Sequence, residues 1–317
     1  MPRSSGGALV GTVVVFVFFA IFAGSNHFVT LNGTASWADQ AAELGIVAVP
    51  VGLLMIGGEF DLSIAAVIGM SAVVVSIGTG TEHWPLVISI ALALAVAVLV
   101  GLINGMVTVH TGLPSFIVTL ASYFSLTGAT LFASFVIASN SYQTVTVTGF
   151  FHSVFAGSVH QFNASLIWCF LVVIAAGYVL SYTVFGNWVM ATGGDRTAAV
   201  TVGVPVNRVK VTLFVTTALG AALLGIIQAI EYGGGQVGQG EGFIFEAIIA
   251  ATIGGVLLQG GYGSALGVML GAATYSIVSV GVYYTGWNSN LAQLFIGLLV
   301  LVAVLANNFL RRLALSE

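Results

Sequence analysis

About ten long apolar segments, separated by very few charged residues, limit what this chain can fold into. Charged residues make up 5% of the 317 residues, hydrophobic residues make up 58%, and the mean hydropathy is +1.11. Soluble domains carry roughly 25% charged residues, so this chain cannot cover a water-facing surface of its size. The composition excludes a soluble enzyme, a disordered chain and a nucleic-acid-binding protein, which needs a basic surface. It predicts an all-α polytopic membrane protein.

A membrane-spanning helix needs about 20 mostly apolar residues, and the chain offers about ten such segments. The second and eighth are short and end near Gly57–Gly58 and Gly260–Gly261. We interpret both as discontinuous helices, whose free backbone groups must lie inside protein or face water. The first is interpreted as an anchor helix, with a signal peptide as the alternative. The expected segments are 8–28, 43–57, 62–79, 85–109, 114–138, 163–182, 209–230, 243–258, 262–283 and 290–310.

The positions of Lys and Arg predict the orientation of the chain in the membrane. All six of these residues lie in three places, at Arg3, in the loop 183–210 and at Arg311–Arg312. Cytoplasmic loops are enriched in Lys and Arg, and ten spans put these three regions on one side. We therefore expect both termini and the middle loop to be cytoplasmic. The opposite loops, 29–42, 80–84, 139–162, 231–242 and 284–289, contain neither residue.

Two parts of the chain resemble each other when it is shifted by about 203 positions. Many transporters are built from two repeats with the pathway at their interface. We therefore expect one transmembrane domain, 1–317, with repeat-like halves at about 43–110 and 246–312. These halves are parallel on the span count above. The matched residues include Glu43, Gly57, Gly58, Trp84 and Asn104, which fall on Glu246, Gly260, Gly261, Trp287 and Asn307.

The run Gly57–Ser63 places two carboxylates between apolar segments. A charge at mid-bilayer costs at least about 2.5 kcal/mol, so these side chains should face a cavity, a partner or the membrane edge. One interpretation is a polar break along a sugar pathway, because carboxylates accept hydrogen bonds from hydroxyls. The other is a cytoplasmic turn in which Asp61 caps the next helix. The pathway candidates are Glu59, Phe60, Asp61, Ser63, Asn104 and Glu246; for Asn104 a helix–helix hydrogen bond, and for Glu246 a charge near a span end, are the alternatives.

The middle loop predicts a short exposed helix. Asp195 is a candidate N-cap, Ala198–Val202 has the length of about two turns, and Gly203 is a suitable end. Small side chains there let a partner surface approach closely, while an ordinary positively charged loop is the alternative. Arg208 and Lys210 are expected to fix the loop at the membrane edge. The glycine-rich run 233–240 is interpreted as a flexible outer loop, with docking of another protein as the alternative.

Three separate motifs carry a resemblance to a known family. Met55–Ile64 reads MIGGEFDLSI, the middle loop contains GGDRTAA followed by GVPVNRVK, and Glu246–Ala251 is followed by the GGYGS of Gly260–Ser264. Together they resemble the ribose/xylose/fructose-type sugar permeases of bacterial ATP-binding-cassette importers, over about residues 40–310. One departure is Ala65–Ala66, where that family usually has a Gly-Ser type pair.

The resemblance also implies the partners of this chain in a complete importer. Such permeases lie in the bacterial inner membrane and act as dimers, so it implies a second permease copy, a cytoplasmic ATPase and a periplasmic sugar-binding protein. ATP and Mg²⁺ would be bound by the ATPase, and this chain lacks the G-x-x-x-x-G-K-[ST] loop needed to bind them. It also implies that the loop at about 186–209 couples to the ATPase, through Gly194, Asp195, Arg196, Ala198, Ala199, Gly203 and Pro205.

Two other functions are weighed against an importer subunit. A stand-alone secondary transporter would use Glu59 or Asp61 as a proton site. An intramembrane enzyme would need a nucleophile–base pair or metal ligands at depth, and the sequence offers no such spacing. Its one cysteine, Cys169, lies in an apolar run. Because neither alternative matches the three motifs, the sequence favours a permease for a monosaccharide with no cofactor of its own.

Overall fold

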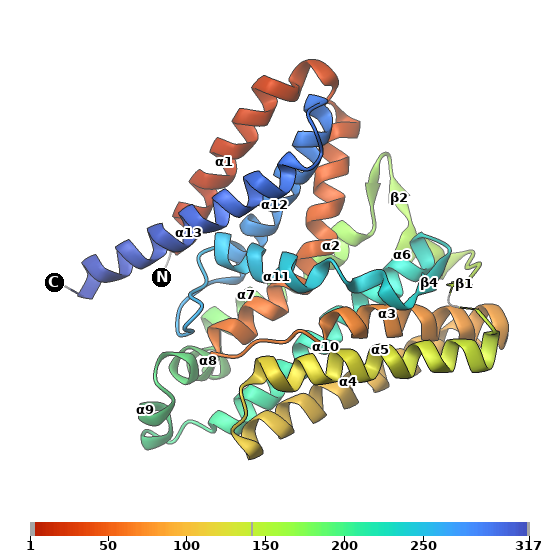
Figure 1. Ribbon diagram of the computed structural model, residues 1–317, viewed down its shortest axis with the longest axis horizontal. Helices are drawn as coiled ribbons and strands as arrows, with labels where there is room; N and C mark the ends of the chain where they lie inside the picture. The colour runs from red at the N-terminus through yellow and green to blue at the C-terminus, as the bar shows by residue number, and fades with distance from the viewer. Residues whose placement is uncertain (1–3, 141, 316–317) are drawn as a thin grey trace.

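The computed structural model describes residues 4–140 and 142–315, and the side chains of 6–140 and 142–305 (Figure 1). Arg3 lies outside the described residues, as do the side chains of Asn307, Arg311 and Arg312. Long helices dominate, which confirms the all-α prediction. They are α1 (Ser4–Ala23), α2 (Leu31–Ile56), α3 (Ile64–Ser76), α4 (Leu86–Thr111), α5 (Ser115–Ala138), α7 (Ser165–Tyr182), α10 (Val206–Glu231), α12 (Ala265–Thr285) and α13 (Leu291–Leu315).

Short elements connect the long helices. Strand β1 (Tyr142–Thr144) pairs antiparallel with β4 (Gly234–Gln236), and β2 (Ser158–Val159) pairs antiparallel with β3 (Phe162–Asn163). In the first pair Gln143 lies opposite Gly235. The remaining elements are η1 (Gly24–Asn26), a π turn η2 (Ile77–Thr81), α6 (Phe150–Ala156), α8 (Val184–Gly194), α9 (Arg196–Thr201), η3 (Val237–Gly240) and α11 (Phe243–Ile253).

Each of the ten predicted segments overlaps a helix. Within the described residues, eight helices are long and apolar enough to cross a membrane, and α13 adds an apolar stretch over Leu291–Leu305. Helix α11 has 11 residues, so the prediction of a short eighth segment is confirmed. The prediction of a short second segment is wrong, because α2 has 26 residues. Its first half carries Asp39 and Gln40, which are half-buried and tolerated because most of α2 is surrounded by protein.

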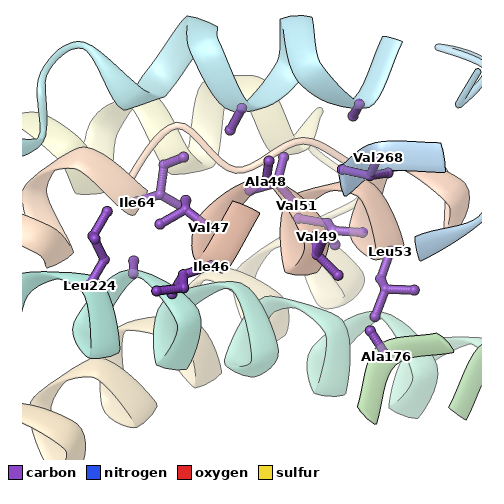
Figure 2. Packing of buried hydrophobic residues seen from close by; sticks show 14 of the residues in the cluster. Ile46, Val47, Ala48, Val49, Val51, Leu53, Ile64, Ala176, Leu224 and Val268 are labelled. Atoms are coloured by element: carbon purple, nitrogen blue, oxygen red, sulfur yellow. The ribbon is translucent and has the colours of Figure 1, made fainter. Parts of the chain in front are cut away.

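Helix α2 forms the centre of the core. From Ala41 to Ile56 every residue of α2 is buried, so its apolar side chains point in all directions. Figure 2 shows them meeting Leu224 of α10, Ala176 of α7 and Val268 of α12. A helix that is apolar on all sides is expected inside a bundle. The long helices around it expose apolar side chains such as Phe132 and Phe170, as lipid-facing helices do.

The two ends of the helical bundle differ in structure. We call one the α9 end, because it carries Arg196–Thr201, and the other the hairpin end, because it carries the β1–β4 pair. Figure 1 shows the start of α1, the end of α13 and α9 on the left, with β1, β4 and α6 on the right. The loop that contains Arg196, Arg208 and Lys210 therefore lies on the same side of the molecule as the start of α1 and the end of α13.

The glycine-rich run 233–240 is a packed segment of the protein. Gly234 pairs with Thr144 as part of the β1–β4 ladder. The chain then follows α3, so that a Cβ placed on Gly235 would lie 2.5 Å from the carbonyl carbon of Ala72, and one on Gly240 would overlap Ala65. The prediction of a flexible loop is wrong here, because its glycines allow close contact between the segment and α3.

Glycines also allow close packing of α11 on α12. A Cβ on Gly271 would overlap the backbone oxygen of Ala250, and one on Gly267 would overlap that of Gly254. The sequence places Gly263, Gly267 and Gly271 four residues apart, a spacing that predicts close helix–helix packing. The structure confirms this for Gly267 and Gly271.

Replacing Gly271 with Ala should destabilise the protein, because the added methyl group must push α11 and α12 apart. Overpacking of this kind typically costs about 1–3 kcal/mol. Gly128→Ala is the matched control, since Gly128 also lies in a helix and has no atom within 4 Å of the added Cβ. Thermal unfolding in detergent should show a lower Tm for Gly271→Ala and an equal or higher Tm for Gly128→Ala. Equal Tm values for all three proteins would contradict the close packing.

Candidate functional site

The short helix of the middle loop forms as predicted. The side chain of Asp195 accepts hydrogen bonds from the backbone N–H groups of Thr197 (2.8 Å) and Ala198 (3.0 Å), which caps the first turn. Helix α9 covers Arg196–Thr201, and Gly203 follows it with a φ of 84°. The N-cap and the terminating glycine are thus both confirmed.

The predicted coupling residues do not all lie on one surface. Gly194, Asp195, Arg196, Ala198 and Gly203 are exposed, and Pro205 is half-buried. Ala199 is 3% exposed, so in this conformation it offers little surface to a partner. It faces inward because the loop folds back over α9, where the N–H of Val204 donates to the carbonyl oxygen of Ala199 at 3.0 Å.

Two exposed apolar side chains at α9 were not among the predicted coupling residues. Val200 is 57% exposed and Val202 is 77% exposed. Isolated exposed valines are normal on a surface, but these two lie beside the exposed Ala198 and Gly203. A usable signal was present in the sequence, because TAAVTVGV places apolar residues in a loop with no helical neighbour to bury them.

Three chain segments meet through glycines directly before α9. We call Gly58, Gly193, Gly194, Gly260 and Gly261 the glycine junction. The N–H of Gly261 donates to the carbonyl oxygen of Ile56 at 2.8 Å, which ties the loop after α11 to the end of α2. A Cβ on Gly193 would overlap that same oxygen and lie 2.7 Å from the nitrogen of Gly261. The end of α8 is therefore in direct backbone contact with both broken segments.

The ends of α2 and α11 have the same backbone geometry. Gly57 and Gly254 have φ values of −71° and −68°, and Gly58 and Gly255, which follow them, have φ values of 85° and 89°. A positive φ of this size favours glycine. The matching positions are 197 residues apart (254 − 57), and not the 203 of the sequence comparison. Gly260 and Gly261 both have positive φ, so they belong to the later part of the second break.

Glu59 forms an ion pair across the α9 end. Its Oε1 accepts a hydrogen bond from Nζ of Lys210, and the two side chains are 11% and 12% exposed. Lys210 lies in the first turns of α10, shortly after α9. The expectation that Lys210 fixes the loop at the membrane edge is thus replaced by a specific contact with the break after α2.

Asp61, Ser63 and Asn104 belong to one buried hydrogen-bond network. Asp61 is 1% exposed, and its oxygens accept from the N–H (2.9 Å) and hydroxyl (2.6 Å) of Ser63 and from the hydroxyl of Thr217 (2.6 Å). Asn104 donates to Ser63 at 2.9 Å and accepts from Ser122. The network joins the start of α3 to α4, α5 and α10, so these side chains stabilise the break.

Phe60 and Leu62 complete the attachment of the break to α5. The N–H of Phe60 donates to Ser115 at 3.0 Å, and that of Leu62 donates to Thr119 at 3.1 Å. Backbone donors freed by the interruption of a helix must be satisfied inside the membrane. These contacts show how the irregular backbone between α2 and α3 is tolerated.

Glu246 lies in a separate polar region toward the hairpin end. It lines a cavity of about 450 Å³ between α2, the end of α10 and the start of α11. In this cavity Glu43 accepts hydrogen bonds from Gln228 (2.6 Å) and Tyr232 (2.8 Å). The lining contains four carboxylates and no cationic side chain; its residues are Ser36, Asp39, Gln40, Glu43, Leu44, Asn163, Gln228, Glu231, Tyr232, Phe243 and Glu246.

Comparison with known proteins gives consistent matches over most of the chain. Residues 33–304 match the family described as "Branched-chain amino acid transport system / permease component". The chain is 31% identical over 306 residues to the xylose/arabinose import permease protein XylH of Sulfolobus acidocaldarius, covering 94% of this chain and 83% of that protein. No solved structure matches the chain.

Two further relatives show the same pattern. The fructose import permease protein FrcC of Rhizobium meliloti is 29% identical over 314 residues, covering 96% of this chain and 86% of FrcC. The ribose import permease protein RbsC of Escherichia coli (strain K12) is 27% identical over 290 residues, covering 90% of this chain and 88% of RbsC.

Breaking the Glu59–Lys210 pair from one side should destabilise the protein more than removing both charges. Lys210→Met leaves the buried carboxylate of Glu59 without a partner, and losing one member of a buried pair costs about 3–5 kcal/mol. The double variant Glu59→Gln/Lys210→Met should recover most of the lost Tm in detergent. If the double variant is as unstable as Lys210→Met alone, the ion pair is not what holds this contact.

Proposed function

Because this chain belongs to the family of branched-chain amino acid transport system permease components, we propose that it is the membrane-spanning subunit of an ATP-driven importer for a monosaccharide. The observation that carries the proposal is an exposed helix, α9, which directly follows the end of α8, where Gly193 is in backbone contact with both broken segments of the bundle. The names of three relatives point to pentoses and hexoses as the class of cargo.

The arrangement of the two ends supports an orientation with both termini in the cytoplasm of a bacterial cell. Arg196, Arg208 and Lys210 lie at the α9 end, and the start of α1 and the end of α13 lie on the same side (Figure 1). Positive side chains are retained on the cytoplasmic side. The hairpin end then faces the periplasm, where a sugar-binding protein delivers its cargo.

Helix α9 docks on a separate cytoplasmic ATPase. Its exposed face combines Ala198, which lets a partner approach, with the exposed valines Val200 and Val202. Apolar side chains in the centre of an interface contribute most when a partner removes them from water. Ala199 is buried on the inner face of α9 and supports the fold of the middle loop.

Movement of α9 reaches the bundle along two connections. The first is the glycine junction, where Gly193 lies against Ile56 and Gly261 without intervening side chains. The second is the Glu59–Lys210 pair, which joins the break after α2 to the start of α10. Packed elements transmit displacements because interiors are close-packed. ATP binding to the ATPase therefore moves α2, α10 and the loop after α11 together.

The cavity beside Glu246 takes part in the sugar pathway. Its volume of about 450 Å³ lies within the range of small-molecule sites. Carboxylate and amide oxygens accept hydrogen bonds from sugar hydroxyls, and the excess of negative charge disfavours anionic cargo. A second copy of the chain completes the pathway, as in the dimeric importers that this sequence resembles.

The alternative, a secondary transporter with a proton site at Glu59 or Asp61, has weaker support. Glu59 is paired with Lys210, and Asp61 accepts three hydrogen bonds. Both carboxylates are thus held in fixed contacts at the α9 end and in the break. Neither is among the residues that line the cavity.

Reconstitution in liposomes tests the proposal directly. Uptake of a radiolabelled monosaccharide should require the ATPase encoded with this chain, the binding protein and ATP. Uptake driven by a proton gradient in liposomes that contain this chain alone would contradict the proposal and favour the secondary transporter.

The same preparation tests α9 as the docking site. Val202→Asp should reduce copurification of the ATPase about tenfold or more, because an unpaired carboxylate in an apolar contact costs more than ~1.4 kcal/mol. Val159→Asp is the matched control, since Val159 is 71% exposed at the hairpin end, and it should leave copurification unchanged. Equal copurification of both variants would exclude α9 as the docking surface.

A further inference from the structure

The connection between α10 and α11 is an extended segment that enters the bundle. Helix α10 ends at Glu231 and α11 begins at Phe243, and the chain between them forms β4 and η3 without an α-helix. A Cβ on Gly69 of α3 would overlap the backbone oxygen of Val237, and Gly240 reaches Ala65. Figure 1 shows β4 and the residues after it lying along α3.

This segment lies against α3 from Ala72 to Ala65, close to the start of that helix. Ala65 lies 16 residues (81 − 65) before Thr81, the end of the span Ile64–Thr81, which corresponds to roughly 24 Å of helix in a hydrocarbon core of about 30 Å. Ile244 at the start of α11 packs against Leu62 and Ala65, with Leu120 and Tyr123 of α5 beside them. Helix α11 is short because its start already lies deep in the bundle.

The segment has one buried face and one exposed edge. Gly234, Gly235 and Gly240 are buried against the protein. We call the exposed residues Gln236, Gly238, Glu241 and Gly242 the pathway edge. Irregular backbone and a carboxylate cannot face lipid at this depth, because backbone and side-chain polar groups need water or protein partners there.

We propose that the pathway edge lines the water-filled translocation pathway and that Gln236 and Glu241 hydrogen-bond the hydroxyls of the passing sugar. The inference rests on the proposed function for the identity of the cargo. It assigns to the pathway four residues that do not line the cavity beside Glu246. The glycine-rich segment thus lines one side of the translocation pathway.

Two glycines of the pathway edge leave room for neighbouring carboxylates. A Cβ on Gly238 would lie 3.1 Å from Oε1 of Glu241, and one on Gly242 would lie 3.2 Å from Oε1 of Glu246. The two carboxylates therefore extend over the glycines on the exposed side. A larger side chain at either glycine would displace a carboxylate that the sugar meets.

Cysteine labelling in the reconstituted complex tests the proposal. Gln236→Cys and Glu241→Cys are treated with a charged methanethiosulfonate, with and without a saturating concentration of the transported sugar. Ile174→Cys is the control, since Ile174 is 56% exposed near the middle of α7. Both test cysteines should react at least about tenfold faster than Ile174→Cys, because the reactive thiolate forms only in water. The sugar should slow both reactions.

The natural cysteine separates a misfolded variant from an informative one. Cys169 is 3% exposed, so its own labelling, located by peptide mass, marks unfolded protein to be discarded. Reaction of Gln236→Cys and Glu241→Cys no faster than Ile174→Cys in folded protein would overturn the proposal. Fast reaction without protection by sugar would overturn the sugar contact. Failure of the unmodified complex to import sugar would refute the proposed function, while the labelling rates would still report whether the edge is hydrated.

Discussion

The direct backbone contact of Gly193 with the end of α2 is the constraint on which the rest of the structure depends. It brings the last turn of α8 against the carbonyl oxygen of Ile56, which already accepts the N–H of Gly261. No side chain lies between the three segments to absorb a displacement. A displacement of α9 that carries the end of α8 with it would therefore act on the end of α2 and on the loop after α11.

Because α2 is buried, the contact at its end connects to several other helices. Helix α2 packs against α7, α10 and α12 along its length (Figure 2). Its second half is apolar on every side, whereas its first half contributes Asp39 and Glu43 to the polar cavity. Ile56 and the residues of α2 that line the polar cavity thus belong to the same helix.

Two side-chain contacts attach the break after α2 to α10. Asp61 ties the start of α3 to Thr217 of α10, and Glu59 ties the break to Lys210 of the same helix. Together these contacts join the break to α10 at two positions. The extended segment between α10 and α11 lies along α3, the helix that follows this break.

Local signals in the sequence predicted much of this structure. Asp195 and Gly203 mark the ends of α9 because a cap and a terminating glycine act within a few residues. The start of α2 could not be predicted from apolarity, since Asp39 and Gln40 lie in a helix that other helices shield from lipid. The Glu59–Lys210 pair joins residues 151 positions apart, and no local pattern indicates such a contact. The packing of Gly235 and Gly240 on α3 likewise depends on tertiary structure, although their spacing was visible.

The ratio of sugar imported to ATP hydrolysed tests the central claim most directly. It is measured in the reconstituted complex for Gly193→Ala and for Gly128→Ala, a control in α5 whose added Cβ would have no atom within 4 Å. Gly193→Ala should lower the ratio by about fivefold or more, the low end of a typical coupling free energy, while ATP hydrolysis continues and Gly128→Ala keeps the natural ratio. An unchanged ratio in Gly193→Ala would show that force does not pass through this contact.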